Sequence, residues 1–287
     1  MIDETRPEGM APPVSADKTD PPDERRPLRL LVRWLLISLA LLVLVRVFVL
    51  EPYGIPFDSP SMEPTILPGD VMLVDKLPYI IRSLRYIPFT RIPIPYLEFG
   101  GFGTLRRGDV VIFDYPTSSR AAGSIEQYVK RCVAIGGDTV RLREGRILVN
   151  GVEAPAPIAG QHRRFPLDTA RAWPPLRDGR HLIVPYRGMV IRMDSVAQAR
   201  WRPLIESEGV SVEYKNHIVF LGGLPAVEYV VRRDYFFALG DNSSNSRDSR
   251  VFGFIPYDHL VGRAWRLYWS RDQDGNVRWK RIGKLVE

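Results

Sequence analysis

The hydrophobic positions form two patterns: one long apolar run near the N-terminus and many short runs after it. The long run covers residues 30–50 and contains only two charged side chains, Arg33 and Arg46. It shows no polar face at helical spacing, and a helix of this length would be roughly 31 Å long, about the thickness of a bilayer core. The pattern predicts a transmembrane helix over residues 29–50. A helix buried in a protein core is the alternative.

The charges on either side of this run predict its orientation. Arg25, Arg26, Arg29 and Arg33 lie before or at its start, whereas residues 51–70 contain no Lys or Arg. By the positive-inside rule the N-terminus is cytoplasmic and the chain after residue 50 lies outside the cytoplasm. No small-x-small cleavage site follows the run, which favours a permanent anchor over a cleaved leader.

The segment before the span, residues 1–28, is rich in proline and charged residues and has no aromatic residue. Such a composition buries too little apolar surface to offset the entropy of ordering. It predicts a disordered cytoplasmic tail.

Short runs of β-branched and aromatic residues, separated by turn residues, dominate the rest of the chain. Asn150-Gly151 and Gly222-Gly223 are typical of tight hairpin turns, and helical spacing recurs only over 194–208. The fold class predicted is mainly β, an antiparallel β domain. The expected strands cover residues 71–75, 109–115, 127–135, 139–143, 146–149, 217–221, 227–232, 235–239 and 261–269.

We expect a β core from residues 51–155 together with 226–275, an inserted subdomain over 156–225, and a C-terminal strand or tail over 276–287. Residues 77–103 combine aromatic residues, Ile and Pro without strand alternation. They indicate either a surface that touches the membrane interface or a loop that covers the core.

Composition and charge narrow the function classes. The net charge of +7 lies wholly in residues 51–287, because residues 1–50 hold seven basic and seven acidic side chains. Beside an anionic bilayer this charge would favour membrane association, and a solvated basic surface is the equal alternative. Outside the cytoplasm a nucleic-acid partner is not expected.

The single cysteine, Cys132, excludes an intramolecular disulfide, and the spacing of the histidines indicates no metal site. The histidines are His162, His181, His217 and His259.

One lysine stands out chemically. Lys130 lies in a run otherwise suited to a buried strand, where desolvation would lower its pKa and let it act as a neutral base. A serine needs such a neighbour to become a nucleophile, and a Ser–Lys pair can replace a Ser–His–Asp triad. A lysine at the edge of a strand is the structural alternative.

Four segments together resemble the conserved boxes of bacterial type I signal peptidases. They cover residues 59–75, 107–116, 127–138 and 235–256, in this order and behind the apolar run. The resemblance implies a signal-peptidase-like antiparallel β catalytic domain with a Ser–Lys dyad. Ser61 in Pro60-Ser61-Met62-Glu63-Pro64-Thr65 matches the nucleophile, and Lys130 in Tyr128-Val129-Lys130-Arg131 matches the general base.

Further roles follow from the same resemblance. The Ser59 hydroxyl and the Ser61 N–H would form the oxyanion hole. Ser246 would orient the lysine, and Asp248 and Arg250 would form a structural ion pair. The substrate cleft would be lined by Met62, Tyr128 and Val129.

The chain departs from the family pattern in three places. Pro60 replaces a common glycine, which stiffens the turn and removes one N–H. Two extra residues, Phe57-Asp58, precede Ser59, so the upstream pocket is not transferable. Ser243-Ser244 stand where an Arg-Asp pair is common, so a salt bridge of that loop is not expected.

The resemblance implies a membrane-anchored serine endopeptidase that removes N-terminal signal peptides after small residues, reading an A-x-A pattern, without a metal or other cofactor. Its partners would be exported preproteins and the lipid bilayer, and it would act as a monomer. It would be a single-pass protein of the bacterial inner (plasma) membrane with a periplasmic or extracytoplasmic catalytic domain. The alternatives are a Ser–Lys peptidase of another branch, such as a pilin-maturation or self-cleaving repressor type, and an anchored β domain that binds preproteins without catalysis.

Overall fold

The structure is a computed structural model that describes residues 26–82, 98–116, 125–143, 146–154 and 181–287. The chain divides into two units, residues 1–43 and 44–287. Helix α1 (Arg26–Phe48) begins three residues before the predicted span. The predicted tail lies outside the described residues up to position 25, and its last three residues are helical.

The apolar side chains of α1 are exposed, with Leu31, Trp34 and Leu35 each 65% accessible. Among the described residues, hydropathy identifies no helix with both the length and the apolar character needed to cross a membrane.

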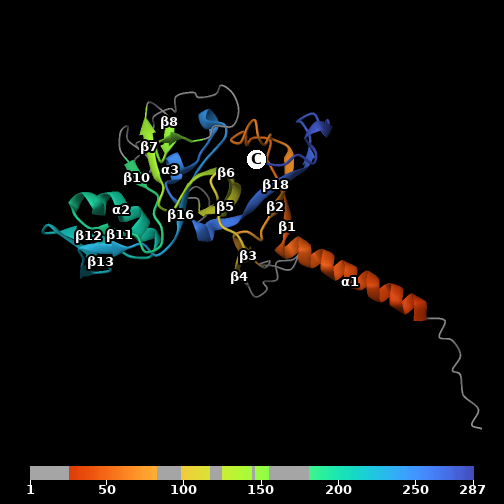
Figure 1. The fold of residues 1–287 in the computed structure, drawn as a ribbon, viewed down its shortest axis with the longest axis horizontal. Coiled ribbons are helices and arrows are strands. Elements are labelled where there is room, and N and C mark those ends of the chain that lie inside the picture. The colour runs from red at the N-terminus through yellow and green to blue at the C-terminus, as the bar shows by residue number, and fades with distance from the viewer. Residues whose placement is uncertain (1–25, 83–97, 117–124, 144–145, 155–180) are drawn as a thin grey trace, which may run out of the picture. The chain divides into compact units, whose positions relative to one another are not determined.

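A seven-stranded antiparallel sheet organises the second unit (Figure 1). Its strand order is β1-β2-β18-β5-β6-β16-β17, so strands distant in sequence lie side by side. The strands are β1 (Leu50–Gly54), β2 (Asp70–Asp75), β5 (Val110–Pro116), β6 (Ile125–Ile135), β16 (Tyr235–Leu239), β17 (Ile255–Pro256) and β18 (Leu260–Ser270).

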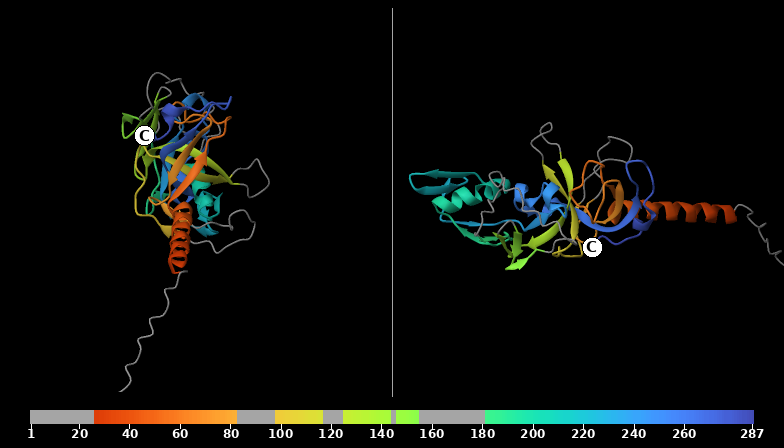
Figure 2. Two further views of the ribbon diagram at one scale, coloured as in Figure 1. Left: turned by 90° about the vertical axis from the view of Figure 1, so that its right-hand side faces the viewer. Right: turned by 90° about the horizontal axis from the view of Figure 1, so that it is seen from above.

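Smaller sheets complete the unit. One has the order β10-β7-β8-β9, another β12-β13-β14, and two are pairs, β11-β15 and β3-β4. Helix α2 (Ser195–Ser207) packs against β12 and β13, as Figures 1 and 2 show. The strands are β3 (Ile80–Arg82), β4 (Glu98–Gly100), β7 (Thr139–Arg143), β8 (Arg146–Val149), β9 (Val152–Glu153), β10 (His181–Ile183), β11 (Val190–Arg192), β12 (Val212–Lys215), β13 (Ile218–Leu221), β14 (Leu224–Pro225) and β15 (Glu228–Val230).

The prediction of a mainly β, antiparallel domain is confirmed, and a strand forms in each of the nine predicted segments. Both predicted hairpin turns form, with positive φ at Asn150, Gly151, Gly222 and Gly223, as such two-residue turns require. The helix predicted over 194–208 is α2, whose first turn is capped by the Asp194 carboxylate.

Strand β6 separates two apolar clusters because its side chains alternate between the faces of the sheet. Val129 packs in one cluster with Met62, whereas Tyr128 and Cys132 pack in the other. A third cluster joins the described part of residues 156–225 to β7 and β8. The domain boundaries themselves stay a prediction.

Candidate active site

Ser61 lies in the loop between β1 and β2, which is closed at its base by two backbone hydrogen bonds. Ile55 N–H donates to Asp70 O (2.8 Å) and Gly69 N–H donates to Ile55 O (3.0 Å). Met62 and Ile66 are buried, so the loop is fixed to the core directly beside Ser61. The Ser61 residue itself is half-buried.

Lys130 reaches Ser61 from strand β6. Its Nζ lies 2.7 Å from Ser61 Oγ and 2.8 Å from the Val129 carbonyl oxygen. The residue is only 3% exposed, and β5 and β16 flank its strand on either side. The two residues are 69 positions apart in sequence, and the fold brings their side chains into hydrogen-bond contact.

Because it is buried, Lys130 binds a proton less tightly than an ordinary lysine does. Desolvation lowers the pKa of Lys130 to about 8, against the opposing effect of the Asp248 and Asp241 charges. A lysine with such a pKa is partly neutral near neutral pH and can then accept a proton from a hydroxyl. The pair therefore has the geometry and the protonation range of a nucleophile and its base.

Ser246 lies near the backbone carbonyl of Ser61. In the described part of the chain its buried Oγ has no hydrogen-bond partner. Gly240 is the close neighbour: a Cβ at this position would overlap Ser246 Oγ and lie 2.6 Å from Ser61 O. The role of Ser246 in orienting the lysine stays a prediction.

The ion pair predicted between Asp248 and Arg250 forms. Arg250 Nε lies 2.7 Å from Asp248 Oδ1, and Arg250 Nη2 lies 2.7 Å from Asp248 Oδ2. Asp248 also accepts the Gly240 N–H (3.0 Å) and caps helix α3 (Ser249–Phe252). This Asp248–Arg250 ion pair fixes the segment that holds Gly240 and Ser246 beside Ser61.

A second buried ion pair, which the sequence reasoning missed, joins β6 to the same segment. The Arg131 guanidinium contacts both oxygens of Asp241, at 2.8 and 2.7 Å. It also donates to the carbonyl of Gly108 (2.8 Å). Its position directly after Lys130 in an otherwise apolar run was the available signal.

Asn242 was also missed, and it contacts the loop of Ser61 directly. Its backbone N–H donates to Ser61 O (3.0 Å), and its Nδ2 donates to Pro60 O (3.2 Å). The hydroxyl of Ser244, one of the two serines that depart from the family pattern, donates to Asn242 Oδ1 (3.0 Å). Ser59 is half-buried in the same loop, and its oxyanion role stays a prediction.

The three residues predicted to line the substrate cleft lie around the dyad. Met62 and Val129 are buried in one apolar cluster, and Tyr128 is half-buried with its ring 5.7 Å from Lys130 Nζ. Their contact with a substrate stays a prediction. The extra residue Phe57 packs beside Gly69 and Arg271, with the Arg271 guanidinium 5.8 Å from its ring.

The C-terminal segment braces the far end of the Ser61 loop. The Arg281 guanidinium donates to Thr65 O (2.8 Å) and pairs with the fully buried Asp70 carboxylate (2.6 Å). Ser270 Oγ donates to the same carboxylate (2.5 Å). Sequence reasoning assigned this segment only as a strand or tail.

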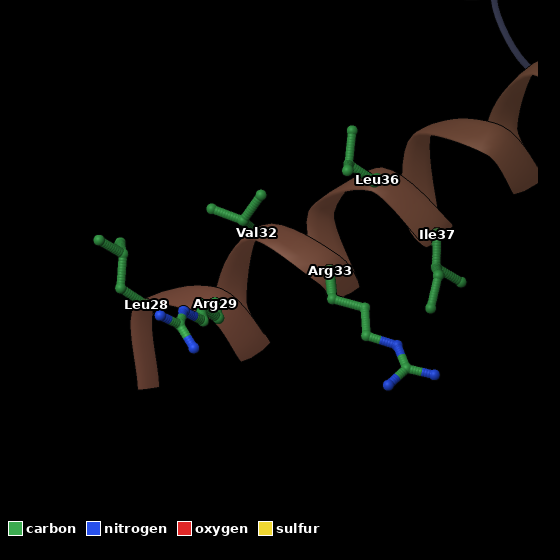
Figure 3. A pocket seen from close by; sticks show the side chains of 6 residues that line it. All are labelled: Leu28, Arg29, Val32, Arg33, Leu36 and Ile37. Atoms are coloured by element: carbon green, nitrogen blue, oxygen red, sulfur yellow. The ribbon is translucent and has the colours of Figure 1, made fainter. Parts of the chain in front are cut away.

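A shallow pocket lies elsewhere, along one side of α1 (Figure 3). It is formed by residues of this single helix and contains no nucleophile or carboxylate. Its lining residues are Leu28, Arg29, Val32, Arg33, Leu36 and Ile37. Over the described ranges, no group of three or more His, Cys, Asp or Glu side chains is arranged to hold a metal ion.

The chain is similar to known signal peptidases along most of its length. Residues 28–269 match a family model described as "Signal peptidase, peptidase S26". Signal peptidase I of Aquifex aeolicus is 29% identical over 84% of this chain and 83% of its own length. The Pseudomonas aeruginosa signal peptidase I is 29% identical over 81% of this chain and 69% of its own length, and that of Buchnera aphidicola from Schizaphis graminum is 26% identical over 84% and 77%. A match over most of the chain shows that this enzyme belongs to the signal peptidase family, peptidase S26.

Proposed function

We propose that the enzyme removes N-terminal signal peptides from exported preproteins through a Ser61–Lys130 dyad and an acyl-enzyme intermediate. The observation that carries this proposal is the 2.7 Å contact between Ser61 Oγ and the Nζ of a buried lysine. A serine hydroxyl is a weak nucleophile until a neighbouring base takes its proton, and no other side chain bonds to this hydroxyl in the described residues.

The first half of the reaction forms the acyl-enzyme. Neutral Lys130 takes the Ser61 Oγ proton as the oxygen attacks the carbonyl carbon of the scissile bond. The negative charge that develops on the carbonyl oxygen is held by the Ser61 N–H and the Ser59 hydroxyl. Protonated Lys130 then gives its proton to the leaving amine as the C–N bond breaks.

The second half releases the signal peptide. Lys130, neutral again, takes a proton from a water molecule that attacks the acyl carbon, and the proton returns to Ser61 Oγ as the ester bond breaks. Lys130 Nζ has two acceptors in the structure, Ser61 Oγ and Val129 O, and an amine or ammonium group at this position has room for one more partner. The unpartnered Ser246 hydroxyl is our candidate for that partner.

Specificity for small residues, the A-x-A pattern, would arise from shallow apolar subsites near Met62, Tyr128 and Val129. Apolar side chains that are already packed leave little depth for a large substrate residue. Among them, Val129 and Met62 are 7% and 2% exposed, which agrees with shallow subsites.

We also propose that α1 anchors the enzyme in the inner membrane, with the N-terminus in the cytoplasm and the catalytic unit outside. The support is the exposure of its apolar side chains, which an apolar environment would cover. Anchoring would hold the dyad at the bilayer surface, where the apolar part of a signal peptide ends. Catalysis by a monomer is part of the same proposal.

The direct test is cleavage of a preprotein by purified Ser61→Ala and Lys130→Ala variants. Each variant is expected to lose at least about 1,000-fold in kcat, because both halves of the reaction use both side chains. Ser195→Ala and Lys280→Ala, at exposed positions, serve as matched controls and should cleave normally. Near-normal cleavage by either dyad variant would show that the dyad is wrong.

A second readout separates catalysis from mere binding of preproteins. A serine-directed acylating inhibitor should modify Ser61 in the wild-type enzyme and should leave the Ser61→Ala variant unmodified. A wild-type enzyme that binds preprotein without cleaving it and without inhibitor labelling would favour a non-catalytic preprotein-binding domain instead.

A further inference from the structure

Asn242 holds the turn of Ser61 at two consecutive peptide units, from a position 182 residues away from Pro60. Its backbone N–H bonds to Ser61 O (3.0 Å), and its side-chain Nδ2 bonds to Pro60 O (3.2 Å). The first bond fixes the peptide that follows Ser61, and the second fixes the peptide that precedes it. The side chain therefore acts on the peptide unit that contains the Ser61 N–H.

The direction of that N–H follows from the planarity of the peptide bond. Pro60–Ser61 is a trans peptide, in which the C=O and N–H lie in one plane and point in opposite directions. A donor that fixes the Pro60 carbonyl on one side therefore aims the Ser61 N–H to the other side. A hydrogen bond to the carbonyl also polarises the amide and strengthens its N–H as a donor.

The Ser61 N–H is available to a ligand. In the described part of the chain it donates to no acceptor, although its neighbours in the same turn do: Ser59 N–H bonds to Pro56 O (3.2 Å) and Glu63 N–H to Pro60 O (3.1 Å). The proline at position 60 contributes no N–H of its own. In the described residues the Ser61 amide is therefore an open backbone donor at the proposed nucleophile itself.

The orientation of the Asn242 amide is fixed by chemistry on both sides. The Pro60 carbonyl can only accept, so the Asn242 nitrogen must face it. The Ser244 hydroxyl donates to the opposite end of the amide, at Oδ1 (3.0 Å), and Asn245 N–H donates to the Asn242 backbone carbonyl (3.0 Å). The Asn242 side chain is therefore held in one orientation, as a clamp on the Pro60 carbonyl.

We propose that Asn242 is a positioning residue for catalysis: by clamping the Pro60 carbonyl, its side chain aims the Ser61 N–H at the oxyanion of the tetrahedral intermediate. The inference rests on the proposed function, since it concerns the oxyanion that Ser61 attack creates. Asn242 bonds to the backbone carbonyls of Pro60 and Ser61 and not to Ser61 Oγ, so its effect passes through the peptide of Ser61.

The test is a kinetic comparison of Asn242→Ala with the wild-type full-length enzyme on one preprotein. Loss of an oxyanion donor costs about 10²–10³ in kcat in other enzymes. Here the donor stays and the Glu63 bond to Pro60 O remains, so we expect a fall in kcat of roughly 10- to 100-fold with KM changed less than about threefold. The affinity for a peptide aldehyde, which forms a tetrahedral adduct with the serine, should fall in parallel with kcat.

Asn242→Asp is the second variant, because it keeps the shape of the side chain and the backbone bond to Ser61 O but removes the Nδ2 donor. A new carboxylate could also act by raising the pKa of Lys130, and the pH profile separates the two effects. A misaimed N–H lowers kcat at every pH, whereas a charge effect disappears above the pKa of the lysine. Asn216→Asp, in the exposed turn between β12 and β13, is the matched control for the added charge and should leave the profile unchanged.

Each outcome decides between the alternatives. A kcat for Asn242→Ala within twofold of wild type, or an unchanged aldehyde affinity, overturns the inference. Full recovery of kcat in Asn242→Asp at high pH, together with a normal kcat in Asn242→Ala, also overturns the inference. Failure of the wild-type enzyme to cleave the preprotein would overturn the proposed function itself, which distinguishes that failure from a failure of the clamp. Thermal unfolding of both variants within a few degrees of wild type confirms that the kinetics report on folded enzyme.

Discussion

At the scale of single residues, the burial of Lys130 sets the pH at which the proposed dyad would act. A base must be neutral, and burial lowers the pKa of this lysine to about 8. An exposed lysine with a pKa above 10 would be neutral in only a very small fraction of molecules at pH 7. The position of Lys130 in the sheet, between β5 and β16, therefore determines its chemistry as much as the residue type does.

The rate of cleavage should rise with pH and then level off. Below the pKa of about 8 the lysine is protonated and inactive as a base, so kcat should increase about tenfold per pH unit up to pH 7–8 and become constant above about pH 9. The measurement is kcat for one preprotein from pH 6 to pH 10. A rate that falls over this range, or one that is flat, would contradict Lys130 as the base.

Gly240 leaves room, by its lack of a side chain, for Ser246 and for the Ser61 carbonyl. A Cβ would overlap Ser246 Oγ and approach Ser61 O to 2.6 Å, so something must move. Because a displacement of about 1 Å near reacting atoms can cost 100-fold in rate, we expect Gly240→Ala to lower kcat by about that factor. Gly54→Ala is the control, since nothing lies within 4 Å of a Cβ there. Normal kcat in Gly240→Ala would show that the turn adapts freely.

At the scale of elements, the C-terminal segment supports the loop between β1 and β2, which contains Ser61, from outside the large sheet. Arg281, in the short 3₁₀ helix η3 (Trp279–Arg281), joins the Thr65 carbonyl to the buried Asp70 carboxylate at the start of β2. A buried carboxylate that loses its partner is left with an uncompensated desolvation cost. The brace therefore contributes both to stability and to the position of the loop.

Arg281→Ala should lower the free energy of unfolding by about 2–4 kcal/mol, somewhat less than the full cost of breaking a buried pair because Arg278 and Ser270 stay near Asp70. Lys280→Ala, an exposed neighbour in the same 3₁₀ helix, should change it by less than about 0.5 kcal/mol. Denaturant unfolding measures both. Equal stabilities of the two variants would show that the brace contributes nothing to folding.

The strands that the sequence predicted are those whose own residues alternate or cluster as β-branched and aromatic runs, such as β6 and β18. The strands it missed are short or carry proline and polar residues. β1, with Pro52 at its centre, is an edge strand held by pairing with β2, and β10 forms by pairing with β7. Pairing between distant segments supplies their stability, and no local pattern records it.

In the site, too, local motifs were recognised from the sequence, whereas contacts between distant segments were not. The motifs around Ser61 and Lys130 marked these two residues as candidates through their resemblance to a family. They did not give the distance between them, because 69 positions of chain separate them. Asn242 was missed because its contact with Pro60 depends on the return of the chain after β16. The family resemblance implied the ion pair of Asp248 and Arg250, which forms within one short segment.

At the scale of the whole molecule, the proposed association with a membrane could rest on surface charge or on helix α1. The net charge of +7 in residues 51–287 would give a salt-sensitive attraction to anionic lipid, whereas the apolar side chains of α1 would give one that salt does not reverse. These two mechanisms predict different behaviour of the full chain.

The full chain should float with lipid vesicles and stay bound in about 1 M salt, where exposed charges interact over only roughly 3 Å. Replacing Leu31 and Leu35, both exposed on α1, by Asp should reduce the bound fraction severalfold. Exposed Val196→Asp, on α2, is the control and should leave binding unchanged. Complete release of the wild-type chain by salt alone would show that surface charge, and not α1, holds it.

Cys132, the single cysteine of the sequence, is buried in the core beside β5 and β16, and burial raises the pKa of its thiol. A protonated, enclosed thiol reacts very slowly with alkylating reagents. The wild-type protein is therefore nearly silent toward maleimide probes without any prior removal of cysteine. A cysteine introduced at exposed Phe102, Tyr268 or Trp279 would be the one fast-reacting thiol of the molecule, so the natural chain is already a background for labelling, spectroscopy and cross-linking at chosen positions.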